Sequence, residues 1–463
     1  MIIANDIAMQ VLKEALKTGG DFAEIYAEDK KSTSLSMEDN ALENAVSGRS
    51  HGVGIRVFKG TNSVYVYTND SSLKGLLDCA AQAAAAIEGN EPLNIDIVLK
   101  HNIIKTAHPI LVPFDSVSLS QKVDIVKRAY SAASSYDPLI KQTSVNYAES
   151  LTNVQIINSE GLNVEDERAL TRLGISAIAS NGTENQSGRE SPGAKMGFEF
   201  YRDKIDVEAF AKEAGRTAVT MLKADPCPAG KMPVAIENGF GGVIFHEACG
   251  HSLEATSVAR GQSVFCGKMG EKIASDVVTA VDDATIPNAW GSSNIDDEGH
   301  PGQKNVLIEN GILKSYLVDK LNGRRMNAEA TGSSRRQSYA FAPTSRMSNT
   351  YIAPGQSTRD EIISSIDNGL YCAKMGGGSV NPITGEFNFV VNEGYLIKSG
   401  KIASPVRGAS LIGYGHEVLF DIDMVGDNLK LAQGMCGSIS GSIPTNVGQP
   451  AIRVSKILVG GKK

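Results

Sequence analysis

Hydrophobic and polar residues alternate with two different periods along the first half of the chain. Apolar residues recur at helical spacing in 7–16, 72–87 and 118–134, which predicts three amphipathic helices. Period-two alternation predicts strands at 22–28, 32–37, 52–58, 63–67, 142–149, 154–157, 171–179 and 197–201. The first half is therefore expected to mix helices and strands.

The pattern changes after a fourth amphipathic helix, which is predicted at 207–222. Residues 225–230 contain two prolines and a glycine, so they predict a linker. Short strands are predicted beyond it, at 232–236, 306–309, 313–318, 387–391, 395–398 and 411–412. We therefore expect an α+β fold with a mixed α/β N-terminal domain at 1–224. A β-rich C-terminal domain, barrel-like or a sandwich, is expected at 225–463.

Composition narrows the class of protein. A chain of 463 residues is too long for one ordinary core, which supports more than one domain. Its 41% hydrophobic and 21% charged residues are typical of a globular protein and not of a disordered one. The net charge of −7 gives no general attraction to nucleic acid, so direct nucleic-acid binding is not expected.

The sequence also bears on the cellular compartment. No apolar run approaches the length of a membrane span, and the first residues lack the basic start of a signal peptide. Six cysteines are scattered without a framework spacing, which suits a reducing environment. We therefore expect a cytoplasmic protein with no membrane association.

Residues 246–251, which read His-Glu-Ala-Cys-Gly-His, contain the clearest candidate chemistry. Imidazoles hold zinc in metal-dependent hydrolases, and a carboxylate takes a proton from the water there. His246 and His251 could supply the first function, and Glu247 the second. The alternative is a set of solvated side chains on an amphipathic helix. The apolar and glycine-rich residues at 239–245 favour the metal site, because they indicate a buried approach.

The spacing of the two histidines is unusual. Residues five apart on a regular helix point about 140° away from each other, since each residue turns the helix by about 100°. His246 and His251 can share one ion only if the helix ends or is distorted between them. Gly250 permits such a break, so we expect one there, while Cys249 is expected to pack in the helix.

A catalytic zinc usually has three protein ligands and one position for water, so a third ligand is needed. One candidate is the acidic cluster 296–300, which ends in a histidine. His416, followed by Glu417, is another, and Cys436 between glycines is the third. Composition and spacing do not choose among these three candidates.

The stretch around the hexapeptide resembles the TldD/PmbA family, whose members are also called modulators of DNA gyrase. Further segments resemble it in the same order along the chain, at 297–299, 336–339, 346–350, 405–409 and 434–437. The resemblance covers essentially the whole chain and is densest from 232 to 454. Ordered agreement of this kind is more specific than a single short motif.

The resemblance implies a metal-dependent activity. TldD-type subunits of the family carry the metal motif and PmbA (TldE)-type partners lack it, so this chain is similar to the TldD type, a zinc metallopeptidase. By motif, His246, His251 and Cys436 would bind zinc, and Glu247 would be the catalytic carboxylate. The loop 438–444 departs from the family's pattern. This departure bears on substrate preference and not on metal binding.

Four polar residues in the other family-like segments are further candidates. Asp297, Glu298, Arg336 and Tyr339 could contact substrate or orient the groups around the metal. Hydrogen bonding in turns and at strand edges is the alternative for all four.

The resemblance also implies partners. Unfolded peptides are the expected substrates, since the sequence has no Walker-type phosphate loop that would indicate an ATP-driven unfoldase. A homodimer, or a heterodimer with a PmbA/TldE-type subunit, is expected. The alternative function is a non-catalytic binding or regulatory subunit of such a complex, against which the complete motif argues.

Overall fold

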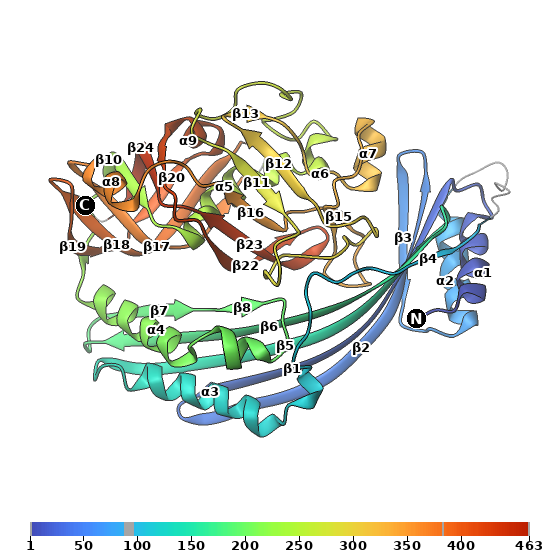
Figure 1. The fold of residues 1–463 in the computed structure, drawn as a ribbon, viewed down its shortest axis with the longest axis horizontal. Coiled ribbons are helices and arrows are strands. Elements are labelled where there is room, and N and C mark those ends of the chain that lie inside the picture. The colour runs from blue at the N-terminus through green and yellow to red at the C-terminus, as the bar shows by residue number, and fades with distance from the viewer. Residues whose placement is uncertain (1, 88–96, 382–383, 462–463) are drawn as a thin grey trace.

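The structure of the protein, a computed structural model, describes residues 2–87, 97–381 and 384–461. Helices and strands are mixed throughout, which confirms the predicted α+β class (Figure 1). The α-helices are α1 (Asn5–Leu16), α2 (Leu73–Ala85), α3 (Leu119–Ser134), α4 (Val207–Leu222), α5 (Val243–Ala248), α6 (Ala255–Val258), α7 (Lys320–Met326), α8 (Arg359–Ser364) and α9 (Gly415–Asp421). Single turns of other helix types occur at η1 (Phe114–Ser116), η2 (Phe200–Lys204), η3 (Gly239–Gly242) and η4 (Gly250–Leu253).

One long sheet makes up most of the first half. Its strand order is β3-β2-β1-β5-β6-β4, and β7 and β8 also pair with β6. The bounds are β1 (Phe22–Glu38), β2 (Ala41–Lys59), β3 (Asn62–Thr68), β4 (Lys100–Asn102), β5 (Ile140–Asn158), β6 (Leu162–Ser180), β7 (Asn185–Glu190) and β8 (Gly193–Ala194). Strands of 17 to 19 residues extend for roughly 60 Å. The sheet therefore runs beneath the whole C-terminal half in the view of Figure 1.

Each end of this sheet has its own helices and its own hydrophobic core. α1 and α2 pack on the beginning of β1, and their cluster includes Leu12, Ile25 and Ala80. α3 and α4 pack near the other end, in a cluster that includes Val126, Tyr147 and Ala218. The sheet is therefore one element shared by two cores.

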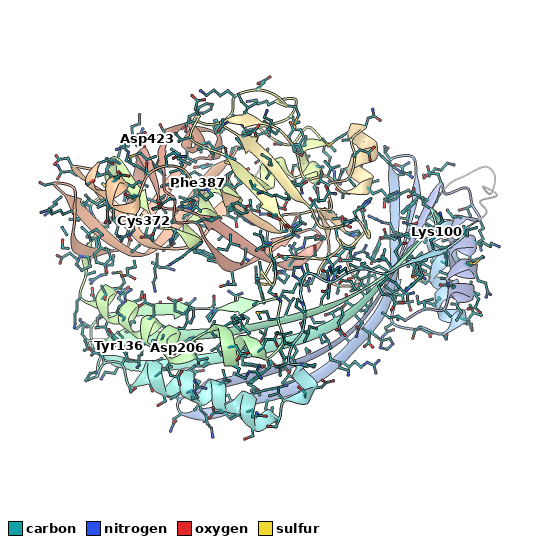
Figure 2. The ribbon with its side chains drawn as sticks, in the orientation of Figure 1. Lys100, Tyr136, Asp206, Cys372, Phe387 and Asp423 are labelled. Atoms are coloured by element: carbon teal, nitrogen blue, oxygen red, sulfur yellow. The ribbon has the colours of Figure 1, made fainter. Side chains whose placement is uncertain are left out.

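The C-terminal half contains a closed barrel. Its ring is formed by β17, β10, β24, β20 and β18, because β17 pairs with both β10 and β18. Cys372 on β17 and Phe387 on β18 are buried in its core (Figure 2). The bounds in this sheet are β9 (Asp225–Pro226), β10 (Gly230–Ile236), β17 (Asn368–Val380), β18 (Glu386–Lys398), β19 (Lys401–Arg407), β20 (Ser410–Tyr414), β21 (Ile422–Val425) and β24 (Ile452–Gly460).

A six-stranded sheet lies beside the barrel, in the order β13-β12-β11-β16-β23-β22. Its strands are β11 (Ala280–Asp283), β12 (Lys304–Glu309), β13 (Ile312–Leu313), β16 (Asn349–Ile352), β22 (Lys430–Ser438) and β23 (Gly441–Gln449). A two-stranded sheet joins β14 (Ser334–Arg335) to β15 (Thr344–Ser345). β22 is the last strand in the order of the six-stranded sheet, so no further strand among the described residues pairs with its outer edge.

The helical periodicity predicted the four long helices well. The helix predicted at 207–222 has those bounds, with the Asp206 carboxylate accepting a hydrogen bond from the Ala209 N–H at its start.

The strand predicted at 197–201 is wrong. The Glu199 carboxylate accepts the N–H groups of Gly197 and Val112, and this draws the segment into a compact turn before η2.

Candidate metal centre

The histidine motif lies where a short helix ends in the C-terminal half. α5 carries His246 and Glu247 and ends at Ala248. Cys249 has φ −130° and ψ −44°, after which His251 lies on η4. The predicted interruption next to Gly250 is confirmed. It brings the two imidazole rings together, with their centroids 5.1 Å apart.

Gly250 is required for packing more than for an unusual backbone angle. A Cβ atom at this position would lie 2.3 Å from the Met347 Sδ. The backbone of Gly250 stays outside the left-handed region, so other residues could adopt its angles. The glycine therefore lets Met347 approach the chain between the two histidines.

Cys436 on β22 completes a three-residue cluster. Its Sγ lies 3.2 Å from the His246 Nε2 and 3.3 Å from the His251 Nε2. One potential ligand atom from each residue lies within 4.8 Å of the others, an arrangement that could hold a metal ion. Cys436 and His246 are buried, with 4% and 3% of their surface exposed. The structure thus brings together the three residues that the resemblance implied as ligands.

The electrostatics of the cluster favour a thiolate. Burial alone would raise the pKa of the Cys436 thiol, but the charge and hydrogen bonds of His246 and His251 outweigh it. Together they lower the pKa to about 3. Cys436 therefore offers an anionic sulfur, the form in which cysteine binds metal.

Glu247 borders the cluster and also faces solvent. One of its carboxylate oxygens, Oε2, lies 3.6 Å from the His251 Nε2, and 27% of its side chain is exposed. The carboxylate is thus close to the potential ligand atoms and can be reached by water. This placement suits a group that exchanges a proton with a water molecule at the cluster.

Glu254 and Arg346 support the cluster, and the motif did not single them out. The Glu254 Oε2 lies 3.2 Å from the His251 Nδ1, which leaves the Nε2 directed at Cys436. Arg346 Nη2 donates to the Cys436 carbonyl oxygen at 2.5 Å, and Arg346 Nε lies 3.9 Å from Glu254. Glu254 follows His251 by three residues, a spacing within one helical turn that could have indicated it.

The other third-ligand candidates lie outside this cluster. Among the described residues, the metal-capable group consists of His246, His251 and Cys436, and contains neither His300 nor His416. Cys249 is fully buried, and its Sγ lies 3.5 Å from the Gly415 carbonyl oxygen. Cys249 is therefore packed outside the metal-capable cluster, as expected, but it lies just beyond the end of α5 and not in the helix.

Asp297, Glu298, Arg336 and Tyr339 lie where the C-terminal half meets the long sheet. Glu298 accepts a hydrogen bond from Arg56 at 2.6 Å, and Arg336 donates to Glu24 at 2.9 Å. None of the hydrogen bonds described for these four residues reaches His246, His251 or Cys436.

Two further contacts complete this arrangement. Asp297 accepts a hydrogen bond from Arg168 at 2.6 Å. The Tyr339 carbonyl accepts one from the Tyr65 hydroxyl, also at 2.6 Å. The four residues therefore join the long sheet to the C-terminal half.

Within 2–87, 97–381 and 384–461, none of the helices is long and apolar enough to cross a membrane.

Sequence comparison gives matches along most of the chain. Three models of the PmbA/TldA metallopeptidases match: domain 1 at 23–87, the central domain at 112–222 and the C-terminal domain at 229–461. A metalloprotease TldD homolog of Haemophilus influenzae is 37% identical over 95% of this chain and 93% of its own. A zinc metalloprotease TldD homolog of Saccharolobus solfataricus is 27% identical over 97% of this chain and 99% of its own.

Solved structures share the fold. A Thermotoga maritima protein described as a candidate modulator of DNA gyrase superposes with a TM-score of 0.80 at 22% identity, covering 98% of this chain and 99% of its own. TldE from Thermococcus kodakarensis superposes with a TM-score of 0.78 at 20% identity, covering 98% and 100%. With matches to all three family domains and a relative above 30% identity over nearly the whole chain, this protein belongs to the PmbA/TldD metallopeptidase family.

Proposed function

We propose that the protein is a zinc-dependent peptidase that hydrolyses peptide bonds in unfolded or extended polypeptides. One observation carries the proposal: His246, His251 and Cys436 converge, and the Glu247 carboxylate lies 3.6 Å from one of their potential ligand atoms. The names of the relatives support it, because several are called metalloproteases and one a zinc metalloprotease.

The donor set fits zinc. Zinc–nitrogen bonds of about 2.0–2.1 Å and zinc–sulfur bonds of about 2.3 Å imply nitrogen–sulfur separations of roughly 3.6 Å in a tetrahedral site. The two separations observed here are 3.2 and 3.3 Å, slightly shorter than that value. Two imidazoles and a thiolate also match the borderline-soft character of zinc and leave a fourth position for water.

In the proposed mechanism, the metal ligands, Glu247 and the residues that position the ligands each have a separate function. A bound zinc ion would lower the pKa of a water molecule from about 15.7 toward about 7 and polarise the substrate carbonyl. Glu247 accepts the proton of the attacking water and delivers it to the leaving amine. Glu254 holds the His251 ring in position, and Arg346 fixes the backbone at Cys436.

The edge of β22 supports an extended substrate. This strand carries Cys436 and is the last in its sheet, so a peptide can add to it through backbone hydrogen bonds. Backbone pairing does not depend on side chains, which would give broad sequence tolerance. Most strands of a folded protein are already paired within its own sheets, so unfolded or extended peptides are the proposed substrates.

The same proposal includes the assembly and the location of the protein. We propose a homodimer or a heterodimer with a PmbA/TldE-type subunit, since TldE shares the fold. All six cysteines are free, which supports a reducing cytoplasm. The division into domains at 1–224 and 225–463 also remains part of this proposal.

Metal analysis together with peptide hydrolysis tests the proposal. The purified protein, alone and with a PmbA/TldE-type subunit, should contain about one zinc per copy of this chain and cleave an unstructured peptide. Zinc-loaded protein that cleaves no such peptide in either form would instead indicate a non-catalytic subunit.

Replacing Cys436 by alanine should weaken zinc binding by more than about 100-fold, since an outer-shell partner alone contributes roughly 10–100-fold. Loss of the sulfur leaves two imidazole ligands, too few to hold the ion tightly. Competition with a chromophoric chelator measures the affinity. Cys266→Ala is the matched control, because Cys266 lies outside the cluster. Equal affinity of the two variants would remove Cys436 from the site.

Replacing Glu254 by alanine should lower zinc affinity by roughly 10–100-fold, because the His251 ring loses the partner that orients it. Glu254→Gln retains an acceptor oxygen and should restore much of the loss. The same chelator competition compares the two variants. If the Glu254→Ala and Glu254→Gln variants both bind zinc as tightly as the unchanged protein does, Glu254 does not position His251.

A further inference from the structure

A cavity of about 380 Å³ lies between the long sheet and the C-terminal half. Strands β1, β5 and β6 form one wall, and residues near β14 and β22 form the other. Six cationic residues line it: Lys30, Arg168, Arg172, Lys195, Arg335 and Arg336. Arg168 and Arg336 bind carboxylates, whereas Arg172, Lys195 and Arg335 form no such pair in the described part of the chain. They come from distant parts of the chain, so the fold itself assembles this cluster.

These last three cations have neutral hydrogen-bond partners. Lys195 is buried, with 4% of its surface exposed, and its Nζ donates to the Ser292 carbonyl oxygen at 2.9 Å. Arg335 Nη1 donates to the Met347 carbonyl oxygen at 2.7 Å, and Arg172 Nη2 donates to the Ser191 hydroxyl at 2.8 Å. In the described part of the chain, none of the three forms an ion pair within 4.0 Å.

Four carboxylates line the cavity, Glu28, Glu149, Asp296 and Asp297, and they are largely engaged elsewhere. Glu149 binds Lys122, and Asp296 accepts the backbone N–H groups of Glu298, His300 and Ser334. Arg168 binds Asp166 at 2.7 Å and Asp297 at 2.6 Å, so both acids already contact a cation. Glu28 also lines the cavity, and burial raises the pKa of its carboxyl group, which disfavours its charged form. The cavity therefore has an excess of cationic side chains over carboxylates that neutralise them by contact.

Burial without an ion-pair partner makes the charged forms costly. It lowers the pKa of Lys195 to about 7 and that of Arg335 to about 10, and it also lowers the pKa of Arg172. A buried cation is ordinarily paired, because desolvation alone is unfavourable. An anion that enters the cavity would supply the missing partner.

Two chain segments connect the cavity with the metal centre. Met435, which lines the cavity, precedes Cys436 on β22, and Arg172 Nη2 lies 3.4 Å from the Gln433 carbonyl oxygen on the same strand. Gln433 and Cys436 are three residues apart, which corresponds to roughly 10 Å along a strand. The second connection is Met347, whose carbonyl binds Arg335 and whose sulfur approaches Gly250.

We propose that Arg172, Lys195 and Arg335 bind a carboxylate of the peptide substrate, roughly three residues away from the bond that is cleaved. This inference rests on the proposed peptidase function and adds a substrate preference to it. The carboxylate is either an acidic side chain or the C-terminus of the peptide, since both present the same group. Arginine and lysine recognise it by charge-assisted hydrogen bonds.

Matched peptides test the proposal on the unchanged, zinc-loaded protein. One series replaces a single glutamate by glutamine at successive positions of an unstructured peptide, and a second exchanges a C-terminal carboxylate for an amide. One carboxylate position should raise kcat/KM by about 10-fold or more over its neutral counterpart. The series that shows the effect identifies the source of the carboxylate. Equal kcat/KM throughout both series would overturn the proposal.

Substitutions of the cationic residues then test which of them cause the preference for a carboxylate peptide. Arg172→Gln and Lys195→Gln should each reduce the advantage of the carboxylate peptide by about 10-fold while leaving cleavage of the neutral peptide unchanged. Arg189→Gln is the matched control, since Arg189 is exposed and lies on β7, which pairs with β6 outside the cavity. An equal loss in Arg189→Gln would contradict a local site.

Thermal stability separates binding from a structural role for Lys195. Lys195→Met removes an unpaired buried ammonium, so the melting temperature should stay level or rise while the carboxylate preference falls. A marked fall in melting temperature would make Lys195 a structural residue and count against the site.

Binding to Glu247→Gln protein distinguishes the two proposals. If unchanged protein cleaves nothing but Glu247→Gln protein binds carboxylate peptides about 10-fold more tightly than neutral ones, the anion site is supported and the peptidase function is not. If cleavage occurs without any carboxylate preference, the peptidase function is supported and the anion site is rejected.

Discussion

Glu247→Gln protein should cleave an unstructured peptide about 10²–10⁴-fold more slowly than unchanged protein, at an equal zinc content. Glutamine has nearly the same shape as glutamate but cannot accept the proton of the attacking water. Glu247 is not among the three metal-capable residues of the cluster, so the ion should be retained. Single-turnover cleavage at matched zinc loading measures the effect, because it reports the chemical step without product release.

Glu417→Gln is a matched control for this variant. Glu417 also follows a histidine directly, but it is exposed and lies outside the metal-capable cluster. Its replacement should leave both cleavage and zinc content unchanged. Cleavage by zinc-loaded, folded Glu247→Gln protein at the normal rate would exclude Glu247 as the proton acceptor, whatever the effect of Glu417→Gln.

The sequence predicted the helices better than the strands, for physical reasons. The helix at 207–222 has an apolar stripe and an N-cap in Asp206, both of which are local signals. The strands predicted at 22–28 and 32–37 are instead one strand, Phe22–Glu38. Polar residues interrupt the alternation at 29–31, but backbone hydrogen bonds to both neighbouring strands continue through them. Pairing with distant strands is not a local property, so the side-chain pattern could not reveal it.

The proximity of Cys436 to the histidines followed from a resemblance and not from spacing. It lies 185 residues beyond His251, and three candidates for the third ligand were equal on local grounds. The distortion near Gly250 could be predicted, since His246 and His251 cannot converge on a regular helix. The reason why a glycine is needed there, which is that Met347 packs against this position, could be seen only in the structure.

The cavity could not be predicted either. Arg172, Lys195 and Arg335 are each unremarkable in sequence, and only the closure of the long sheet on the C-terminal half brings them together. The same closure gives Asp297 and Arg336 their positions beside the cavity. These two predicted substrate residues therefore serve the interface through their ion pairs and hydrogen bonds, and they also border the proposed anion site.

A second large effect is expected at this interface, where Arg56 on β2 bridges two carboxylates. Its Nη2 lies 2.9 Å from Glu24 and 2.6 Å from Glu298, and all three side chains are almost fully buried. Arg56→Met should lower the free energy of unfolding by about 3–5 kcal/mol, because both carboxylates lose a buried partner. The hydrogen bonds that remain, from Arg336 to Glu24 and from the Lys320 N–H to Glu298, only partly compensate. Urea denaturation followed by tryptophan fluorescence measures the change, since Trp290 is buried and lines the neighbouring cavity.

Arg49→Met, on the same strand, tests whether burial causes the effect. Arg49 binds Asp29 at 2.7 Å through two nitrogens, but 65% of its side chain is exposed, so solvent screens the pair. Its replacement should change the denaturation midpoint little. Similar losses for Arg49→Met and Arg56→Met would show that the buried bridge contributes no more than a surface pair. A large loss confined to Arg56→Met would instead show that the buried bridge from Arg56 to Glu24 and Glu298 stabilises the fold more than the surface pair does.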